Sequence, residues 1–269
     1  MSFTVKSGSY DLEKTLKSGQ VFRYRHMDNG IYRVMSLDKV CYVRQVDDSI
    51  FVKTGESKGL SEDDLYWRNY FKFSKDLNKI TELTAGNVFL EKVVEYNRGL
   101  RLLRQDPWEC LISFIISQQK TIPQIQANID KLCTISGKYL GYGLFAFPQP
   151  EELLSISIAP AKLGYREKYV TSTAYEILSG NIKLDSLYPE ACSYRECVQK
   201  LCSLRGVGVK VANCVALFAF GHTRAFPVDT HIDKMLKLPE MKDFKAIDYG
   251  DDAGLMQQYL FNYAISHNI

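Results

Sequence analysis

Apolar and polar residues alternate along the first part of the chain, in the manner of half-buried strands. The alternating segments cover residues 20–24, 31–34, 40–44 and 49–52. Short polar turns, Asn29-Gly30 and Asp47-Asp48 among them, separate these segments. Tight turns of this kind join neighbouring antiparallel strands. The pattern therefore predicts an N-terminal antiparallel β-sheet domain over residues 1–80.

From Ser61 onward the apolar residues recur with helical spacing instead. The segments that fit this spacing are residues 83–103, 108–116, 122–133, 167–179, 194–204 and 254–264. Prolines 148, 150, 160 and 189 mark the loops between them. The predicted fold class is α+β, with the sheet domain followed by a mainly α-helical domain over residues 81–269. A loop-rich connection divides that helical domain into two subdomains.

Lys210 lies in the first turn of an almost wholly apolar segment, residues 209–220. A helix that is apolar on every face is expected to be buried. Burial disfavours the charged form of a lysine and lowers its pKa, and a neutral amine is a nucleophile for a carbon electrophile such as a sugar C1′. The alternative is a lysine whose alkyl chain covers apolar surface while its ammonium reaches water. Lys210 taken alone favours that alternative, and the residues before and after it reverse the preference.

Gly206 and Gly208 form a tight turn between residues 194–204 and the apolar helix. Glycine accepts positive φ and allows another backbone to approach closely. Amide groups in such a turn, at the start of a helix, can bind a phosphate or a bridging cation. We therefore predict a helical hairpin over about residues 194–220 that contacts an anionic partner.

Asp229 immediately precedes apolar positions with helical spacing, which begin at Ile232. An aspartate in this setting is commonly a helix N-cap. It can also act as a carboxylate that faces positive charge developing on a sugar ring. The two roles do not exclude each other.

These motifs resemble those of the helix-hairpin-helix base-excision DNA glycosylases. The resemblance rests on residues 204–212 (LRGVGVKVA), with the lyase lysine in place, and on residues 227–231 (PVDTH). Within that superfamily the chain is most similar to the 8-oxoguanine DNA glycosylases, and the similarity extends over nearly its whole length. The further segments that carry it are residues 17–23 (KSGQVFR), 70–71 (YF), 106–115 (DPWECLISFI), 163–170 (LGYREKYV) and 253–257 (AGLMQ).

The resemblance implies a bifunctional enzyme that extrudes 8-oxoguanine from duplex DNA, excises it and cleaves the strand by β-elimination. In that family Lys210 would attack C1′ and form a Schiff base, and Asp229 would stabilise the cationic sugar. Two alternatives stay open. One is a glycosylase for another oxidised or alkylated base, and the other is a non-catalytic DNA-binding module built on the hairpin.

The resemblance also implies how the damaged base is recognised. The purine would lie between Cys214 and Phe261, and Gln257 would read its Watson–Crick edge. The carbonyl group of Gly19 would accept the hydrogen that oxidation places on N7. Guanine has only an acceptor at N7, so an acceptor facing it would be left unpaired and repelled.

A further group of residues is implied to contact the duplex. Gln118, Gln119 and Tyr165 match positions that probe and wedge the base stack, and Arg166 matches a position that reads the opposite cytosine. Two positions depart from the family pattern, with Gln124 where some members have arginine and Gln119 where asparagine is usual. We therefore expect weakened discrimination for the opposite base. The remaining expected DNA contacts are Gly206, Gly208 and His231.

Composition adds limits on compartment and partners. The net charge of the 269 residues is only +3, but basic residues gather before and within the hairpin, as suits a nucleic-acid backbone. No apolar run reaches the roughly 18 residues needed to span a bilayer, and the first 20 residues lack a signal-peptide pattern. We expect a monomer whose partner is double-stranded DNA, with no membrane association. Its expected location is the cytoplasm, at the nucleoid of a prokaryote, or the nucleus of a eukaryote.

The seven cysteines are an odd number in mostly apolar contexts, which indicates reduced thiols. Several related glycosylases carry an iron–sulfur cluster after the catalytic aspartate, but no cysteine follows Cys214. Cys192, Cys197 and Cys202 lie upstream on a predicted helix and do not replace that set. We therefore expect no metal-ligating residues and no cofactor, apart from a monovalent or divalent cation at the hairpin that could bridge to a DNA phosphate.

Overall fold

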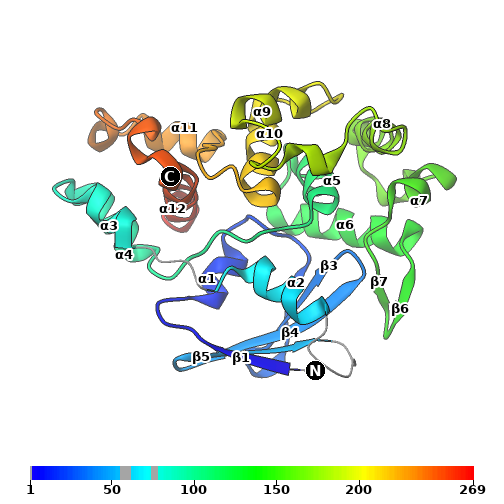
Figure 1. The fold of residues 1–269 in the computed structure, drawn as a ribbon, viewed down its shortest axis with the longest axis horizontal. Helices are drawn as coiled ribbons and strands as arrows, with labels where there is room; N and C mark the ends of the chain where they lie inside the picture. The colour runs from blue at the N-terminus through cyan, green and yellow to red at the C-terminus, as the bar shows by residue number, and fades with distance from the viewer. Residues whose placement is uncertain (1, 55–61, 74–77) are drawn as a thin grey trace.

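An antiparallel sheet of five strands forms the N-terminal part of the computed structural model, which describes residues 2–54, 62–73 and 78–269 (Figure 1). Its strands are β1 (Ser2–Lys6), β2 (Tyr24–His26), β3 (Tyr32–Ser36), β4 (Lys39–Val46) and β5 (Ser49–Thr54). Strands β2 to β5 form a meander, and β1 pairs with the outer edge of β5, giving the order β1-β5-β4-β3-β2. Buried and less buried residues alternate along β5, so one face of the sheet faces a core.

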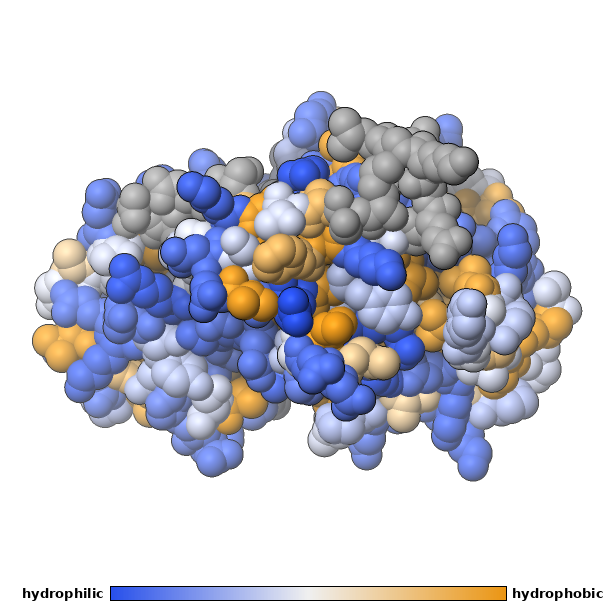
Figure 2. Space-filling model, turned by 90° about the horizontal axis from the view of Figure 1, so that it is seen from below, coloured by the Kyte–Doolittle hydropathy of each residue, from blue (hydrophilic) through white to orange (hydrophobic). Residues whose placement is uncertain are grey.

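Helices α1 (Leu12–Lys17) and α2 (Glu62–Phe71) supply the other side of that core. The α2 side chains Trp67, Tyr70 and Phe71 are buried in it and pack against one another. The opposite face of the sheet is not wholly polar, because Tyr42 and Phe51 are 39% and 43% exposed. Seen from the sheet side, Figure 2 shows apolar residues among hydrophilic ones on this face.

The rest of the chain is helical and contains two further buried clusters. The first unites α5 (Pro107–Ser117), α6 (Ile122–Ser136), α7 (Pro150–Ser155), α8 (Glu167–Leu178), α9 (Tyr194–Cys202), α10 (Val209–Val215) and a π-helical turn, η5 (Ala216–Phe220). The second unites α3 (Asn78–Thr84), α4 (Val88–Tyr96), α11 (Thr230–Leu236) and α12 (Ala253–Ser266). The predicted α+β class, a sheet domain followed by a mainly helical part, is confirmed.

The smaller elements lie in the connections. They are the hairpin of β6 (Tyr139–Gly141) and β7 (Leu144–Phe145) and the short helices η1 (Asp28–Gly30), η2 (Ala159–Ala161), η3 (Gly164–Arg166), η4 (Leu184–Leu187), η6 (Pro239–Met241) and η7 (Ala246–Asp252). Among the helices of the described residues, none combines the length and apolar character that a bilayer crossing requires.

The helix predicted over residues 83–103 is wrong in its extent. It is interrupted between α3 and α4, where Gly86 has φ +87° and the Asn87 side chain caps α4 by accepting from the Leu90 N–H at 3.1 Å. It ends at Tyr96, and Gly99 (φ +91°) then turns the chain toward the sheet domain. A Cβ atom on Gly99 would lie 2.4 Å from the Ser9 carbonyl oxygen. The apolar residues beyond Gly99 therefore serve packing in an extended segment and not in a helix.

The strand predicted over residues 20–24 is also wrong, since only Tyr24 belongs to β2. The alternation there has another cause, because Val21 packs into the sheet core while Phe22 packs into the first helical core. Gln20 is fully buried and its side chain bonds backbone groups, donating to the Arg101 carbonyl at 2.8 Å and accepting from the Leu103 N–H at 2.8 Å. The predicted change of period at Ser61 lies outside the described residues.

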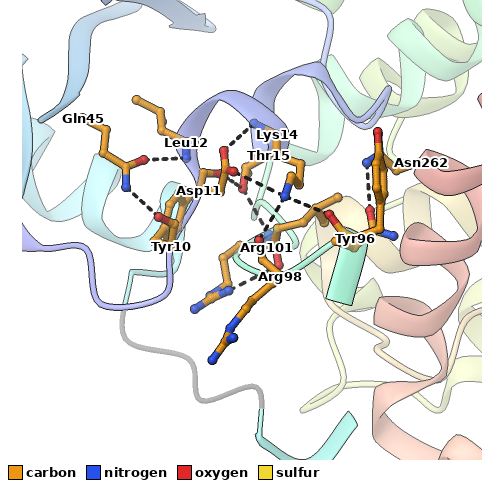
Figure 3. A network of polar contacts seen from close by, with 12 residues as sticks. Tyr10, Asp11, Leu12, Lys14, Thr15, Gln45, Tyr96, Arg98, Arg101 and Asn262 are labelled. Carbon is orange, nitrogen blue, oxygen red and sulfur yellow. Dashed lines mark hydrogen bonds and ion pairs between the residues drawn. The ribbon is translucent and has the colours of Figure 1, made fainter. Parts of the chain in front are cut away.

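Helix α1, which the pattern did not predict because it is only six residues long, ties the sheet to the helical part (Figure 3). The Gln45 side chain of β4 accepts from the Leu12 N–H at 2.8 Å. The Lys14 ammonium donates to the Tyr96 carbonyl at 2.9 Å, and the Thr15 hydroxyl accepts from the Arg101 N–H at 3.1 Å. These contacts hold the end of α1, and with it the segment that follows, against the helical part. The edge strand β1 was likewise not predicted, and the domain boundary at residue 80 stays a prediction.

A buried ion pair joins the sheet domain to α5. Arg23 Nη1 lies 3.2 Å from Glu109 Oε2, and the two side chains are 4% and 8% exposed. Glu109 Oε2 also accepts from the Leu37 N–H at 2.6 Å. Burial raises the pKa of Glu109 to about 7, although the Arg23 charge and the Leu37 N–H act in the opposite direction. The carboxyl group is thus more readily protonated in the folded chain than in the unfolded one.

This difference predicts how stability changes with pH. The folded state keeps the Glu109 proton up to about pH 7, whereas the ordinary value is 4.5. The contribution of this group is therefore fully present below pH 4.5 and is lost as pH rises to about 7, by about 3 kcal/mol. The free energy of unfolding, measured by urea denaturation for the wild type and Glu109→Gln, should show this loss in the wild type only. Glu109→Gln leaves Arg23 unpaired at every pH and so lowers stability throughout. The comparison is therefore between the changes of unfolding free energy with pH in the two proteins, and not between its absolute values. Parallel pH profiles would contradict the prediction.

Candidate active site

The hairpin consists of α9, the turn over residues 203–208 and α10. Gly206 has φ +80°, and a Cβ atom there would lie 2.3 Å from carbon atoms of the Tyr169 ring, so both conformation and packing require glycine. Gly208 is the exposed N-cap of α10, and a Cβ atom there would meet nothing within 4 Å. The start of α10 is therefore left open to the approach of another molecule. Gln118, at the end of α5, donates to the Gly206 carbonyl at 3.1 Å and braces the turn.

Lys210 is half-buried at the edge of the first helical core. The helix is buried on every face from Val211 to Phe220, as expected, but Val209 is 65% exposed. The expectation of full burial fails in the first turn, because the core residues of this helix begin only at Val211 and Val209 lies outside the core. The Lys210 Nζ atom lies 5.6 Å from the centroid of the Phe114 ring. Phe114 was not singled out from the sequence, although it belongs to the segment 106–115 that carries the resemblance.

Cys214 is buried and lies one turn after Lys210 on the same face of α10. Burial raises the pKa of its thiol. The charge of Lys210, and a hydrogen bond with the Lys210 side chain, act in the opposite direction, while the charge of Asp229 acts in the same direction as burial. Lys210 and Asp229 thus both lie within electrostatic reach of one thiol.

Asp229 is the N-cap of α11, which confirms the structural role expected for it. Its Oδ1 atom accepts from the N–H groups of His231 at 3.0 Å and Ile232 at 2.9 Å. The side chain is only half-buried, and both of these bonds use the same oxygen. Capping therefore holds the carboxylate in one place near Lys210 and Cys214 and does not enclose it.

Gly19 and Phe261 come from opposite ends of the chain and are in contact. Gly19 has φ +79°, and a Cβ atom there would lie 2.8 Å from the Phe261 ring. Next to them, Gln258 donates to the Ser18 carbonyl at 2.6 Å and holds α12 against this segment. The His231 ring meets Phe261 edge to face, with 5.9 Å between centroids. These contacts link Gly19 through Phe261 and His231 to the Asp229 cap.

Gln257 on α12 carries a buried acceptor that none of the described residues satisfies. The residue is 4% exposed, and its Oε1 atom has no hydrogen-bond partner. An unpaired buried carbonyl costs about 1–3 kcal/mol, so a ligand N–H group that reached it would gain a favourable contact. An orphaned acceptor one turn before Phe261 is what a site for a heterocyclic N–H donor requires.

Two loops meet beside the hairpin, after α5 and before α8. Gln119 is exposed with φ +53°, a left-handed conformation that is uncommon for a residue other than glycine or asparagine. The Tyr165 hydroxyl lies 3.4 Å from Gln119 Oε1, and the Arg166 guanidinium lies 4.3 Å from the centre of the Tyr165 ring. Gln118, Gln119, Tyr165 and Arg166 are thus brought together at one place.

The Arg166 guanidinium forms hydrogen bonds within its own chain, which the sequence did not suggest. It is 6% exposed, and its guanidinium donates to the Gln118 carbonyl through Nε and Nη2, with a distance of 2.9 Å from Nε. Nη1 donates to the Leu163 carbonyl at 3.2 Å. Most of its donor groups therefore hold the two loops together in this state.

Gln124 has a structural role that the sequence reasoning missed. Its Oε1 atom accepts from the Thr121 N–H at 3.1 Å, at the start of α6. The Thr-x-x-Gln spacing of residues 121–124 was the signal that could have revealed this cap.

The chain is similar to proteins of one known family. Residues 2–111 match the family model described as 8-oxoguanine DNA glycosylase, N-terminal domain. The chain is 34% identical to the N-glycosylase/DNA lyase OGG1 of Arabidopsis thaliana over 196 residues, which covers 63% of this chain and 53% of that relative. The chain thus spans about half the length of that curated relative.

Two solved structures cover the chain more completely. The structure of MBOgg1 in complex with a low-affinity DNA ligand is 33% identical, with a TM-score of 0.89, and the match covers 100% of this chain and 96% of that one. The 8-oxoguanine glycosylase/lyase of Clostridium acetobutylicum, in complex with double-stranded DNA containing cytosine opposite 8-oxoguanine, is 31% identical with a TM-score of 0.87 and the same coverage. The similarity therefore extends over both the sheet domain and the helical part.

Proposed function

This chain belongs to the 8-oxoguanine DNA glycosylase family, and on that premise we propose that it excises 8-oxoguanine from duplex DNA and then cleaves the strand. The observation that carries the proposal is the placement of Lys210 and Cys214 one turn apart on α10, with the Asp229 charge within reach of the thiol, together with the unpaired Gln257 carbonyl and the contact of Gly19 with Phe261. Such a reaction needs an amine, a carboxylate and groups that can contact the base, and these residues supply all three.

The proposed reaction begins with extrusion of the damaged nucleotide, because its C1′ atom cannot be reached inside the stack. The Lys210 amine attacks C1′, the glycosidic bond breaks, and the base leaves with the bonding electrons. The Asp229 carboxylate stabilises the positive charge that develops on the sugar. The sugar ring then opens to a Schiff base on Lys210, a proton leaves C2′, and the bond between C3′ and its phosphate oxygen breaks.

Recognition of the base follows from the residues around it. We propose that the purine lies between the Cys214 thiol and the Phe261 ring, with its Watson–Crick edge donating to the free Gln257 carbonyl. The Gly19 carbonyl accepts the N7 hydrogen that oxidised guanine has and guanine lacks. Discrimination then rests on an acceptor that guanine would leave unpaired.

The proposal is tested by the products formed from a set of duplexes. We expect free 8-oxoguanine and a β-elimination product from a duplex with 8-oxoguanine opposite cytosine, and neither from undamaged DNA. The alternative, a glycosylase for an alkylated base, would release that base using Asp229 and water and would not need Lys210. DNA binding without release of any base would favour the non-catalytic alternative.

The remaining contacts with DNA are part of the same proposal. Gln118, Gln119 and Tyr165 would enter the space that the extruded nucleotide leaves, and Gly206, Gly208 and His231 would lie at the backbone. We propose that the enzyme acts as a monomer wherever genomic DNA lies, in the cytoplasm of a prokaryote or the nucleus of a eukaryote.

A cation at the hairpin is compatible with the residues present. The carbonyls of Leu204 and Gly206 accept from the Val207 N–H and from Gln118, and each keeps a second lone pair that a cation can use. Such an ion would hold a DNA phosphate near the turn, and no step of the reaction depends on it.

The base opposite the lesion should be read only weakly. Gln124 is occupied as a cap of α6, and Arg166 bonds two carbonyls of its own chain. A good charged bidentate contact is worth roughly 1–3 kcal/mol, so its loss should weaken the preference for cytosine roughly 10-fold or more relative to a two-arginine reader. Single-turnover excision opposite cytosine, thymine, guanine and adenine should differ by no more than about an order of magnitude. Strong rejection of adenine would show that Arg166 or a wedge residue is a sufficient reader.

A further inference from the structure

A cluster of metal-ligating side chains lies outside the site described so far. Within the described residues, one ligand atom each from Cys192, Cys197 and His222 lie within 4.8 Å of one another. Cys197 and His222 are buried, and Cys192 is half-buried. Cys192 precedes the cap of α9, Cys197 lies in its first turns, and His222 follows the π-helical turn after α10. The cluster therefore joins the two arms of the hairpin away from the turn over residues 203–208.

Local structure brings the two thiols together. Ser193 is the N-cap of α9, and it forms a capping box with Glu196, whose carboxylate accepts from the Ser193 N–H at 2.8 Å. Cys192 precedes the cap, and Cys197 is the fourth helical residue. In many helices an apolar pair occupies these two positions and packs together. Here both members are thiols, and their sulfur atoms lie within 4.8 Å of each other.

His222 is held in the form that a metal ligand needs. Gly221 (φ +80°) reverses the chain, and the His222 N–H donates to the Ala216 carbonyl at 2.9 Å. The His222 Nε2 atom lies 2.8 Å from the Leu187 carbonyl oxygen. A carbonyl only accepts, so Nε2 carries the proton and Nδ1 keeps its lone pair. A backbone carbonyl that fixes the far nitrogen in this way is the usual partner of a metal-ligating histidine.

We propose that Cys192, Cys197 and His222 bind a zinc ion that joins the two helices of the hairpin. Thiolate and imidazole ligands suit zinc, and two thiols with one histidine supply three of its four tetrahedral positions. Because Cys192 is only half-buried, water can supply the fourth ligand. This site departs from the expectation of no metal-ligating residues, because the histidine that completes it lies far from both cysteines in the sequence.

The proposed ion has a structural role and touches no reacting atom. It fastens the first turn of α9 and the residue before its cap to the segment that follows η5, and so braces the two helices that carry the turn and Lys210. A ligand that binds only the folded chain raises its stability. Zinc should therefore raise the thermal midpoint of the protein whether or not DNA chemistry takes place.

The test uses the full chain, purified under reducing conditions, loaded with zinc and freed of excess metal by gel filtration. We expect about one zinc ion per chain by elemental analysis, in keeping with a single three-residue site. Cobalt in its place should give thiolate-to-metal charge-transfer absorption and the intense visible bands of tetrahedral coordination. Cys192→Ser, at the half-buried position, and His222→Gln should lose the bound metal and the zinc-dependent rise in thermal midpoint.

The matched control is Cys202→Ser, because Cys202 is a half-buried thiol of the same helix that is not part of the cluster. It should bind zinc as the wild type does. Circular dichroism of each variant separates loss of the site from loss of the fold. A wild type that retains no metal, binding that survives Cys192→Ser, or a disulfide between Cys192 and Cys197 in the protein as isolated would each overturn the proposal.

Discussion

Replacing Lys210 with glutamine should lower the single-turnover rate of 8-oxoguanine excision by at least about 10⁴-fold, as the loss of a nucleophile does in other enzymes. Glutamine keeps a polar side chain of similar reach but has no amine to attack C1′. Lys210 is only half-buried, so the variant should stay folded and bind the lesion duplex. Release of the free base from a labelled duplex, measured with enzyme in excess, checks the prediction.

The matched control is Lys200→Gln, because Lys200 is an exposed lysine on α9 of the same hairpin. It should excise the base at close to the wild-type rate. If Lys210→Gln retained a rate within about 10-fold of the wild type, a water molecule and not the amine would be the attacking group.

Replacing Asp229 with asparagine should separate its two roles. Asparagine ranks with aspartate as an N-cap, so the free energy of unfolding should change by less than about 1 kcal/mol. The neutral amide cannot stabilise a cationic sugar, and the excision rate should fall about 10²–10³-fold. The two quantities are measured by urea denaturation and by single-turnover release of the base.

Two further variants serve as controls for Asp229→Asn. Asp229→Ala removes both the cap and the charge and should lose about 1 kcal/mol of stability as well as the activity. Asp233→Asn alters an exposed aspartate on the same helix, paired with Lys237 at 2.6 Å, and should leave the excision rate unchanged. Full activity in Asp229→Asn would mean that Asp229 serves only as a cap.

The local pattern of apolar and polar residues predicted those elements whose apolar side chains all enter a single core. The segments at 40–44 and 49–52 lie within β4 and β5, and residues 254–264 lie within α12. It failed where neighbouring residues serve different cores, as Val21 and Phe22 do. A sequence alone does not show which of two cores an apolar residue enters, so alternation there had the appearance of a strand.

The site residues that could be predicted are likewise those placed by local structure, and not those placed by contacts between distant parts of the chain. Lys210, Cys214 and Asp229 could be proposed from short motifs, because helix spacing and capping place them locally. The contact of Gly19 with Phe261 joins opposite ends of the chain. The bonds that occupy Arg166 and the unpaired Gln257 carbonyl depend on the packed structure as well. The cluster of Cys192, Cys197 and His222 was missed for that reason, since its third member follows η5, 25 residues after Cys197.

The proposed reaction passes through a covalent intermediate at Lys210, and reductive trapping tests that intermediate most directly. Active protein is incubated with a duplex carrying 8-oxoguanine in the presence of sodium borohydride, and the adduct is mapped by mass spectrometry. We expect a covalent protein–DNA complex whose modified residue is Lys210 and which Lys210→Gln does not form. Base release by active protein without any trapped adduct, or an adduct that persists in Lys210→Gln, would contradict it.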